Sequence, residues 1–316
     1  MKFIDFHCDT ASIMLRDNKR LIKNDLKVDI EKLKKGEALA QFFALFIDKE
    51  YRNDTYEYCK EMLSSFKREL DKNSNEIVLC RNINDLENAE NEKKIGAFLT
   101  IEGGEPILGE VDKLREFKEE GVSLITLTWN YENKLGYPNY NFKHMNKGLT
   151  KCGIEIVEEM NKLGMLIDVS HLSDGGFYDV LKYSKAPIIA SHSNSRVKTP
   201  HSRNLTDSMI KLLAENGGVT GINFCNAFLR KENALDSDMA LLSDMARHIK
   251  HIRNVGGIDI LALGSDFDGI DNEVEITDVS KMGMLISVLE KEGFTQDEIE
   301  KIFYKNAKRV IKDVLI

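Results

Sequence analysis

The regular alternation of short apolar runs with amphipathic stretches is the feature that most constrains the fold. The runs are often β-branched and lack strict polar alternation, which is typical of strands buried on both faces of a parallel sheet. They are Phe3–Asp9, Leu39–Asp48, Ile95–Gly103, Leu124–Trp129, Met165–His171, Pro187–Ser193, Gly218–Phe224 and Ile260–Asp268. Among the segments between and after them, helical spacing predicts helices at Thr55–Leu70, Gly148–Leu163, Leu205–Glu215, Ser237–Asn254 and Thr295–Val314.

Eight predicted strands alternating with helices favour a closed α/β barrel of the (β/α)8 TIM type over an open sheet. The chain has 316 residues, which suits either one such barrel or two ordinary domains. We predict a single barrel domain over residues 1–316. The alternative, a doubly wound sheet, would require a glycine-rich phosphate loop after the first strand, and the sequence HCDTAS there is not one.

Charge and cysteine content exclude several classes of partner. The formal net charge is −8, and no basic cluster stands out, so neither nucleic acid nor an anionic membrane is expected to bind. The sequence shows neither a secretory leader nor an apolar stretch of about 18 residues, so we expect no membrane span. The five cysteines are scattered without a CxxC pair, which predicts reduced thiols and a cytoplasmic location.

Metal-ligand residue types stand at the ends of several predicted strands, where a barrel places its active site. His7 and Asp9 end the first run, and alternation along a strand makes them project together. An imidazole beside a carboxylate suits zinc or manganese. Glu102 precedes two glycines that let the chain turn away, so its carboxylate could bridge two cations. His171 and His192 end two further runs.

Each of these residues alone has a structural alternative, because a strand-end histidine is often a hydrogen-bonded core residue and a loop glutamate is usually solvated. Five ligand-type groups at one barrel mouth are few for one metal with an open position but suit two. The sequence therefore predicts two Zn2+ ions per chain, with Mn2+ or Co2+ as possible substitutes, in a metal-dependent hydrolase.

Two other positions are candidates for catalysis and substrate binding. Asp266 could take the proton of a bridging water and pass it to a leaving amine. Asp268 is two residues on and is expected to share its face; Asp266 is preferred because it is closer to the strand. Arg203 could bind the carboxylate of a small peptide with its planar fork, although a loop arginine is usually solvated.

The motifs together resemble those of the membrane dipeptidase (renal dipeptidase) family, peptidase family M19 of the amidohydrolase superfamily. The matching segments are DFHCDT, TIEGGEPI, LITLTWNYENKLG, GLTKCGIEIVEEMNKLGMLIDVSHLSD, IIASHSNSR, HSRNLTD and LGSDFDG, which span nearly the whole chain. The resemblance implies a binuclear zinc dipeptidase that uses metal-activated hydroxide. His7, Asp9 and Glu102 would hold one metal, and Glu102, His171 and His192 the other.

The same resemblance implies that Arg203 binds the substrate carboxylate and that Asp266 contacts the amino end or transfers the proton. It also implies a homodimer, and activity that can extend to a D-residue at the second position. Vertebrate members carry a substrate-contacting histidine where this chain has Trp129, which leaves the role of that residue open. The alternatives are another amidohydrolase reaction, on N-acyl amino acids, lactones or β-lactams, and a catalytically silent metal-binding homologue.

Overall fold

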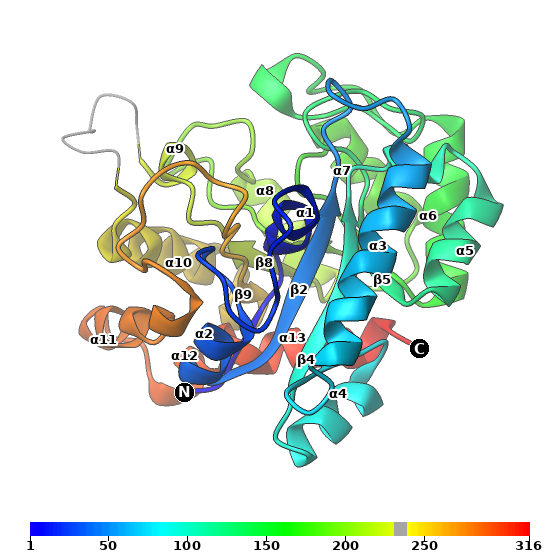
Figure 1. The fold of residues 1–316 in the computed structure, drawn as a ribbon. Coiled ribbons are helices and arrows are strands. Elements are labelled where there is room, and N and C mark those ends of the chain that lie inside the picture. The colour runs from blue at the N-terminus through cyan, green and yellow to red at the C-terminus, as the bar shows by residue number, and fades with distance from the viewer. Residues whose placement is uncertain (231–238) are drawn as a thin grey trace.

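Each of the nine strands in the computed structural model, which describes residues 1–230 and 239–316, runs parallel to its neighbours. The sheet order is β2-β1-β9-β8-β7-β6-β5-β4-β3, and β2 also pairs with β4, so the sheet closes on itself (Figure 1). The strands are β1 (Phe3–Asp5), β2 (Ala38–Phe46), β3 (Ile77–Leu79), β4 (Ile95–Glu102), β5 (Val122–Thr126), β6 (Leu166–Asp168), β7 (Ile189–Ala190), β8 (Val219–Ile222) and β9 (Leu261–Leu263).

Closure confirms the predicted (β/α)8 barrel and excludes the doubly wound sheet. Each of the eight predicted apolar runs supplies one strand of the closed ring. The sequence interpretation missed β3, a three-residue strand that pairs with β4 only at Ile95–Ala97. Further along β4, from Leu99 to Glu102, the partner is β5. One edge of β4 pairs with β2, and β3 and β5 share the other edge. β3 therefore extends the edge that β5 occupies and is not a ninth strand of the closed ring.

The helices lie outside the ring of strands. Four of the five predicted helical segments contain one helix each, namely α3, α6, α8 and α10. The last predicted segment is divided between α12, a π-helical turn and α13. Of the predicted range 237–254, residues 237 and 238 lie outside the described part. The α-helices are α1 (Thr10–Arg16), α2 (Ile30–Lys35), α3 (Thr55–Lys72), α4 (Ile83–Asn91), α5 (Val111–Glu119), α6 (Lys151–Leu163), α7 (Asp174–Tyr183), α8 (Asp207–Glu215), α9 (Asn226–Leu229), α10 (Leu242–Gly256), α11 (Met284–Lys291), α12 (Gln296–Glu300) and α13 (Asn306–Val314). Short 3-10 turns are η1 (Glu105–Ile107), η2 (Tyr140–Phe142), η4 (Ile258–Ile260) and η5 (Val279–Lys281), and the π-helical turn is η6 (Lys301–Lys305).

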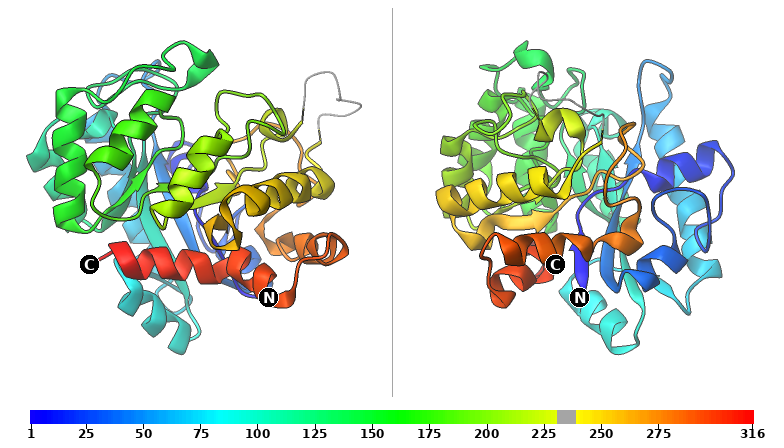
Figure 2. Two further views of the ribbon diagram at one scale, coloured as in Figure 1. Left: turned by 180° about the vertical axis from the view of Figure 1, so that it is seen from behind. Right: turned by 90° about the vertical axis from the view of Figure 1, so that its left-hand side faces the viewer.

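The barrel interior is filled with apolar side chains and closed at one end. Phe42 stacks on Phe98 with ring centroids 4.5 Å apart, and Phe6 packs on Phe42 at 4.8 Å. The same buried cluster includes Val310 and Ile311 of α13, the red helix that runs across the lower half of the molecule in Figure 2. A packed lower half leaves the carboxyl ends of the strands as the place for polar side chains.

The cysteines and the helices were also the subject of expectations from the sequence. All five cysteines are free thiols, as the scattered spacing predicts. Within residues 1–230 and 239–316, no helix combines the length and the apolar character that a bilayer crossing requires.

Candidate metal centre and active site

The five predicted metal ligands converge above the carboxyl ends of four different strands. His7 and Asp9 follow β1, Glu102 ends β4, His171 follows β6 and His192 follows β7. None of the five is more than 7% exposed. Buried ionisable side chains at this density require a compensating charge or hydrogen bonds to each member.

The first group is formed by His7, Asp9 and Glu102, which can together hold one metal ion. The Nε2 atom of His7 lies 3.3 Å from Asp9 Oδ2 and 3.5 Å from Glu102 Oε2. Neither ring nitrogen of His7 has a hydrogen-bond partner of good geometry, and Asp9 Oδ1 has none. Burial lowers the pKa of His7, but the carboxylates of Glu102 and Asp9 outweigh it and hold this pKa well above the ordinary value. The surrounding carboxylates therefore strongly favour a positive charge at His7 Nε2.

The second group is formed by Glu102, His171 and His192. Glu102 Oε1 lies 3.1 Å from His171 Nε2 and 3.5 Å from His192 Nε2, and the two Nε2 atoms are 3.1 Å apart. Glu102 therefore presents one oxygen to each group, as a bridging carboxylate must. Burial raises its pKa to about 7. Burial likewise holds the pKa values of His171 and His192 well below the ordinary value, which favours the neutral imidazoles that bind metals.

The far nitrogen of each of these two histidines has a partner that sets its tautomer. His171 Nδ1 lies 3.1 Å from the amide oxygen of Asn130, which can only accept. His192 Nδ1 lies 2.7 Å from Ser191 Oγ, and that hydroxyl donates to Asp168 Oδ2 at 2.6 Å. Both Nδ1 atoms must then carry the proton and donate it, an arrangement typical of metal-bound histidines.

These tautomers leave two imidazole lone pairs and a carboxylate oxygen facing one another without a hydrogen between them. A cation bound between these atoms would remove the repulsion of lone pairs that lie 3.1–3.5 Å apart. Together with the unpartnered His7 nitrogens, the donor set of three histidines and two carboxylates fits divalent transition metals with nitrogen and oxygen preference.

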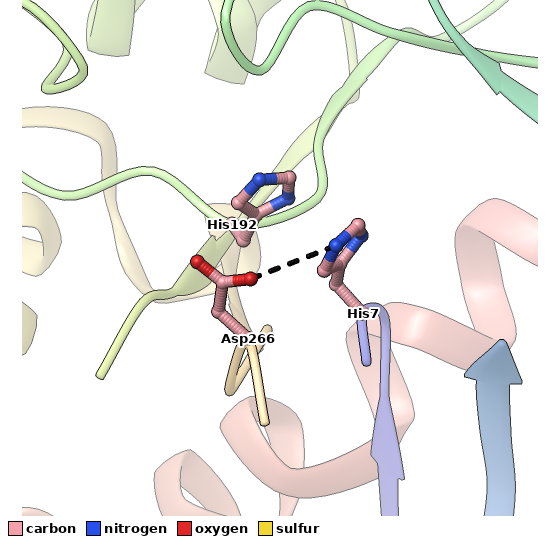
Figure 3. A group of neighbouring side chains, drawn as sticks. All are labelled: His7, His192 and Asp266. Atoms are coloured by element: carbon pink, nitrogen blue, oxygen red, sulfur yellow. Dashed lines mark ion pairs between the residues drawn. The ribbon is translucent and has the colours of Figure 1, made fainter. Parts of the chain in front are cut away.

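Asp266 joins the cluster from the strand β9 side. Its Oδ1 lies 3.6 Å from His7 Nε2, and Figure 3 shows its carboxylate beside the rings of His7 and His192. The three residues form a third group that could hold an ion. Oδ2 of Asp266 accepts a hydrogen bond from Asn223 Nδ2 at 2.8 Å. Burial raises the pKa of Asp266, which His7 opposes, so this carboxyl group is suited to exchange a proton.

The expectation that Asp266 and Asp268 share a face is wrong. Both residues have positive φ angles, 63° and 66°, so the chain is not extended there and strand alternation fails. Asp268 accepts hydrogen bonds from Thr10 Oγ1 at 2.6 Å and from the Lys27 backbone at 2.8 Å. The Asp268 carboxylate therefore links two loops by hydrogen bonds, whereas the Asp266 carboxylate faces the cluster.

Left-handed backbone recurs where ligands leave their strands. His171 has a φ of 65°, an uncommon value for a residue other than glycine. The conformation is held because its carbonyl accepts from Asn139 N at 2.7 Å and from Thr128 Oγ1 at 3.2 Å. Gly103, directly after Glu102, has a φ of 88°, so the expected turn occurs at a residue that tolerates it. Backbone strain of this kind clusters at functional sites.

Arg203 is buried beside the cluster, and the residues that the structure describes offer it no counter-ion. It is 3% exposed, and its guanidinium donates to Ser193 Oγ at 3.4 Å and to the His192 carbonyl at 3.3 Å. Its Nε has no partner, and no carboxylate in the described part of the chain forms an ion pair with it. Burial lowers its pKa, which the more distant Asp266 and Glu102 partly oppose.

The loop that carries Arg203 is fixed from below by His248 of α10. This fully buried histidine accepts from Ser195 N at 3.1 Å and lies 3.1 Å from the Leu229 carbonyl through its other nitrogen. The ring of Phe228, next to Leu229, lies 5.3 Å from the Arg203 guanidinium carbon. His248 therefore links the two loops that lie beside Arg203.

The sequence prediction did not include the residues that orient the candidate ligands. Asp168 is fully buried and accepts from Thr126 Oγ1, Ser170 N, Ser191 N and Ser191 Oγ. An aspartate within an apolar strand was a usable signal, because a buried carboxylate must be fully hydrogen-bonded. Asn130, the residue after Trp129, contacts His171 Nδ1 and so orients that ring.

A closed (β/α)8 barrel with this cluster at its carboxyl end is the architecture of a metal-dependent hydrolase. A model of the membrane dipeptidase family, peptidase family M19, matches residues 1–315. The chain belongs to that family, which is one of metal-requiring peptidases, and is a hydrolase.

Proteins that are similar to this chain in sequence or in structure support the family assignment. An uncharacterized protein of Klebsiella pneumoniae from the pqqA 5′ region is 36% identical over 80% of this chain and 95% of its own length. A protein of Schizosaccharomyces pombe described as an uncharacterized dipeptidase is 33% identical over 98% of this chain and 80% of its own length. A solved dipeptidase described as a metallopeptidase of family M19 is 25% identical, covers 100% of this chain and 99% of its own, and has a TM-score of 0.92.

Proposed function

We propose that this hydrolase is a binuclear zinc dipeptidase, whose substrates include dipeptides with a D-residue at the second position. Mn2+ or Co2+ could replace Zn2+ in the same donor set. His7, Asp9 and Glu102 would hold one ion, and Glu102, His171 and His192 the other, with Glu102 between them. The donor geometry of the two groups and the family membership support this assignment.

The single observation that carries the substrate class is the buried guanidinium of Arg203, which has no ion-pair partner within residues 1–230 and 239–316. A cation taken out of water without a partner is costly, so its retention beside the catalytic cluster indicates an anionic ligand. The planar fork of arginine matches a carboxylate with two parallel hydrogen bonds. A free C-terminal carboxylate is the group that distinguishes a dipeptide from a longer peptide at this distance from the scissile bond.

When bound, the two cations would lower the pKa of a water molecule between them and polarise the peptide carbonyl. The chain's own residues supply the rest. Arg203 would hold the carboxylate and thereby align the scissile bond, so orientation comes from binding remote from the reacting carbon. Asp266 Oδ1 would accept the proton of the water and return it to the leaving amine.

Arg203→Ala should lower kcat/KM for a dipeptide with a free carboxylate by roughly 30-fold or more. The loss of one partner from a desolvated charged pair costs about 2–5 kcal/mol, and about 1.4 kcal/mol corresponds to tenfold. Arg203→Lys should recover only part of the loss because the ammonium lacks the planar fork. Steady-state kinetics of the zinc-loaded proteins measure both effects.

The matched substrate control is the amide of the same dipeptide, which has no terminal carboxylate. It should be a poor substrate of the parent enzyme and should lose little further activity in Arg203→Ala. If acid and amide slowed equally, Arg203 would support the fold or the metals instead. Zinc content measured on the same samples separates those two explanations.

Two rival functions make different predictions in the same assay. Another amidohydrolase would leave dipeptides intact but cleave an N-acyl amino acid, a lactone or a β-lactam. A catalytically silent homologue would bind metal and cleave none of these. A panel of dipeptides and the three rival substrate classes therefore decides between the readings.

Three further expectations from the sequence stay predictions: assembly as a homodimer, a cytoplasmic location, and a single domain over residues 1–316. Sedimentation or light scattering of the purified protein tests the first of them directly.

A further inference from the structure

Three aromatic side chains form a continuous surface beside the metal centre. Phe46 ends β2, and Trp129 and Tyr131 follow β5. The ring of Trp129 lies 4.7 Å from that of Phe46, 5.4 Å from that of Tyr131 and 6.2 Å from that of His171. All three aromatic residues are partly exposed, whereas His171 and the other ligands are buried. We call Phe46, Trp129 and Tyr131 the aromatic shelf.

Neighbouring polar residues contact the two ends of the aromatic shelf. The Lys49 ammonium lies 5.2 Å from the centre of the Tyr131 ring, donates to the Glu132 carbonyl, and lies 3.7 Å from Glu105 Oε1. The Phe46 backbone donates to Ser12 Oγ at 2.9 Å. An apolar surface that is already ordered costs a ligand little to use.

The aromatic shelf lies on the opposite side of the barrel mouth from Arg203 and Asp266. The closed ring runs β1-β9-β8-β7-β6-β5-β4-β2, so β2 lies opposite β7 and β5 lies opposite β9. Arg203 belongs to the loop after β7, and Asp266 follows β9. The shelf therefore lies across the metal centre from the residues proposed to hold the carboxylate and to transfer the proton.

From this placement we propose that the aromatic shelf is the subsite for the side chain of the N-terminal residue, with Trp129 as its principal specificity-determining residue. The inference rests on the proposed function. With the carboxylate on Arg203 and the peptide carbonyl at the metal centre, the part of a dipeptide that remains is its N-terminal residue. That residue lies beyond the centre, on the shelf side.

The chemistry of the shelf defines the preferred substrate class. Offset or edge-to-face contact with another ring is energetically favourable for an aromatic ring, and the ring face also packs against aliphatic side chains. Dipeptides that begin with phenylalanine, leucine or methionine should therefore be favoured over those that begin with glycine. The identity of the second residue should matter less, because its side chain leaves on the other side of the centre.

The test uses pairs of dipeptides of equal composition and reversed order: Phe-Ala with Ala-Phe, and Leu-Ala with Ala-Leu, each with the second residue in L and D form. Gly-Ala serves as the reference. In zinc-loaded Trp129→Ala, kcat/KM should fall by about tenfold or more for Phe-Ala and Leu-Ala, because the substrate side chain loses its apolar contact. For Gly-Ala and the reversed peptides it should fall by less than about threefold. Trp129→Phe should restore most of the Phe-Ala activity, and Tyr178→Ala, an exposed aromatic residue on α7, is the matched control.

A second readout uses the fact that Trp129 is the only tryptophan of the chain. In zinc-loaded Asp266→Asn, which should bind substrate but turn it over slowly, saturating Phe-Ala should change tryptophan emission much more than saturating Gly-Ala or Ala-Phe. Equal changes with all three peptides would contradict the placement of the N-terminal side chain on the shelf.

The outcomes separate this inference from the proposed function. If the parent protein cleaved no dipeptide, the proposed function would fall, and the shelf proposal with it. If the parent cleaved dipeptides but Trp129→Ala slowed Gly-Ala and Phe-Ala equally at full zinc content, only the shelf proposal would be overturned. A loss that followed the second residue would assign the shelf to the other side chain and overturn it as well.

Discussion

Asp266→Asn is expected to lower kcat by about 10²–10⁴-fold while zinc content and substrate binding stay near those of the parent. Asparagine keeps the shape of the side chain and can still contact Asn223, but it cannot take up a proton. The carboxylate of Asp266 faces the cluster, 3.6 Å from His7 Nε2, and burial raises its pKa. Stopped-flow or steady-state hydrolysis of a dipeptide, with metal analysis of the same sample, measures the effect.

Asp268→Asn is the matched control for this substitution. Its carboxylate accepts from Thr10 Oγ1 and the Lys27 backbone, away from the cluster. Its loss should lower the free energy of unfolding by about 1–3 kcal/mol and change kcat by much less than the loss of Asp266. Reversed effects of the two substitutions would show that the wrong aspartate was assigned. If Asp266→Asn lost zinc along with activity, Asp266 would be a ligand in the group with His7 and His192.

Glu102→Ala should have the largest effect on the metals, with zinc content well below two equivalents and dipeptide hydrolysis near background. The two oxygens of this carboxylate face different histidines: Oε1 lies 3.1 Å from His171 Nε2, and Oε2 lies 3.5 Å from His7 Nε2. Removal of a supporting group alone costs about 10–100-fold in metal affinity, so a shared ligand should cost at least as much at each position. Elemental analysis after equilibration against limiting zinc gives the stoichiometry.

Glu105→Ala tests whether any nearby carboxylate would give the same result. Glu105 lies three residues on, is largely buried and belongs to none of the ligand groups in the described part of the chain. Its zinc content should match that of the parent. Full occupancy in Glu102→Ala, by contrast, would remove the bridging assignment.

The sequence predicted the barrel, and it predicted that the candidate ligand residues lie together, because both depend on local rules. Strands buried on two faces read as apolar runs, and a barrel displays its functional groups where those runs end. His7, Glu102, His171 and His192 each lie at or near the end of such a run, so position along the chain was enough to select them as candidates.

The features that the sequence did not reveal depend on contacts between distant segments or on irregular backbone. β3 is three residues long, and its one strand partner is the start of β4 within the part of the chain that the structure describes. Asp266 and Asp268 separate because their left-handed backbone breaks strand alternation, which spacing alone cannot indicate. Asn130 contacts His171, 41 positions along the chain, and a contact of that range has no local signature.

The most direct test of the central claim is stepwise return of zinc to the metal-free protein while hydrolysis of a dipeptide is followed. The account predicts that the rate rises until two equivalents of zinc per chain are bound and then levels off. Full activity at one equivalent would contradict the binuclear centre, and a protein that carries two equivalents of zinc but cleaves no dipeptide would contradict the proposed function.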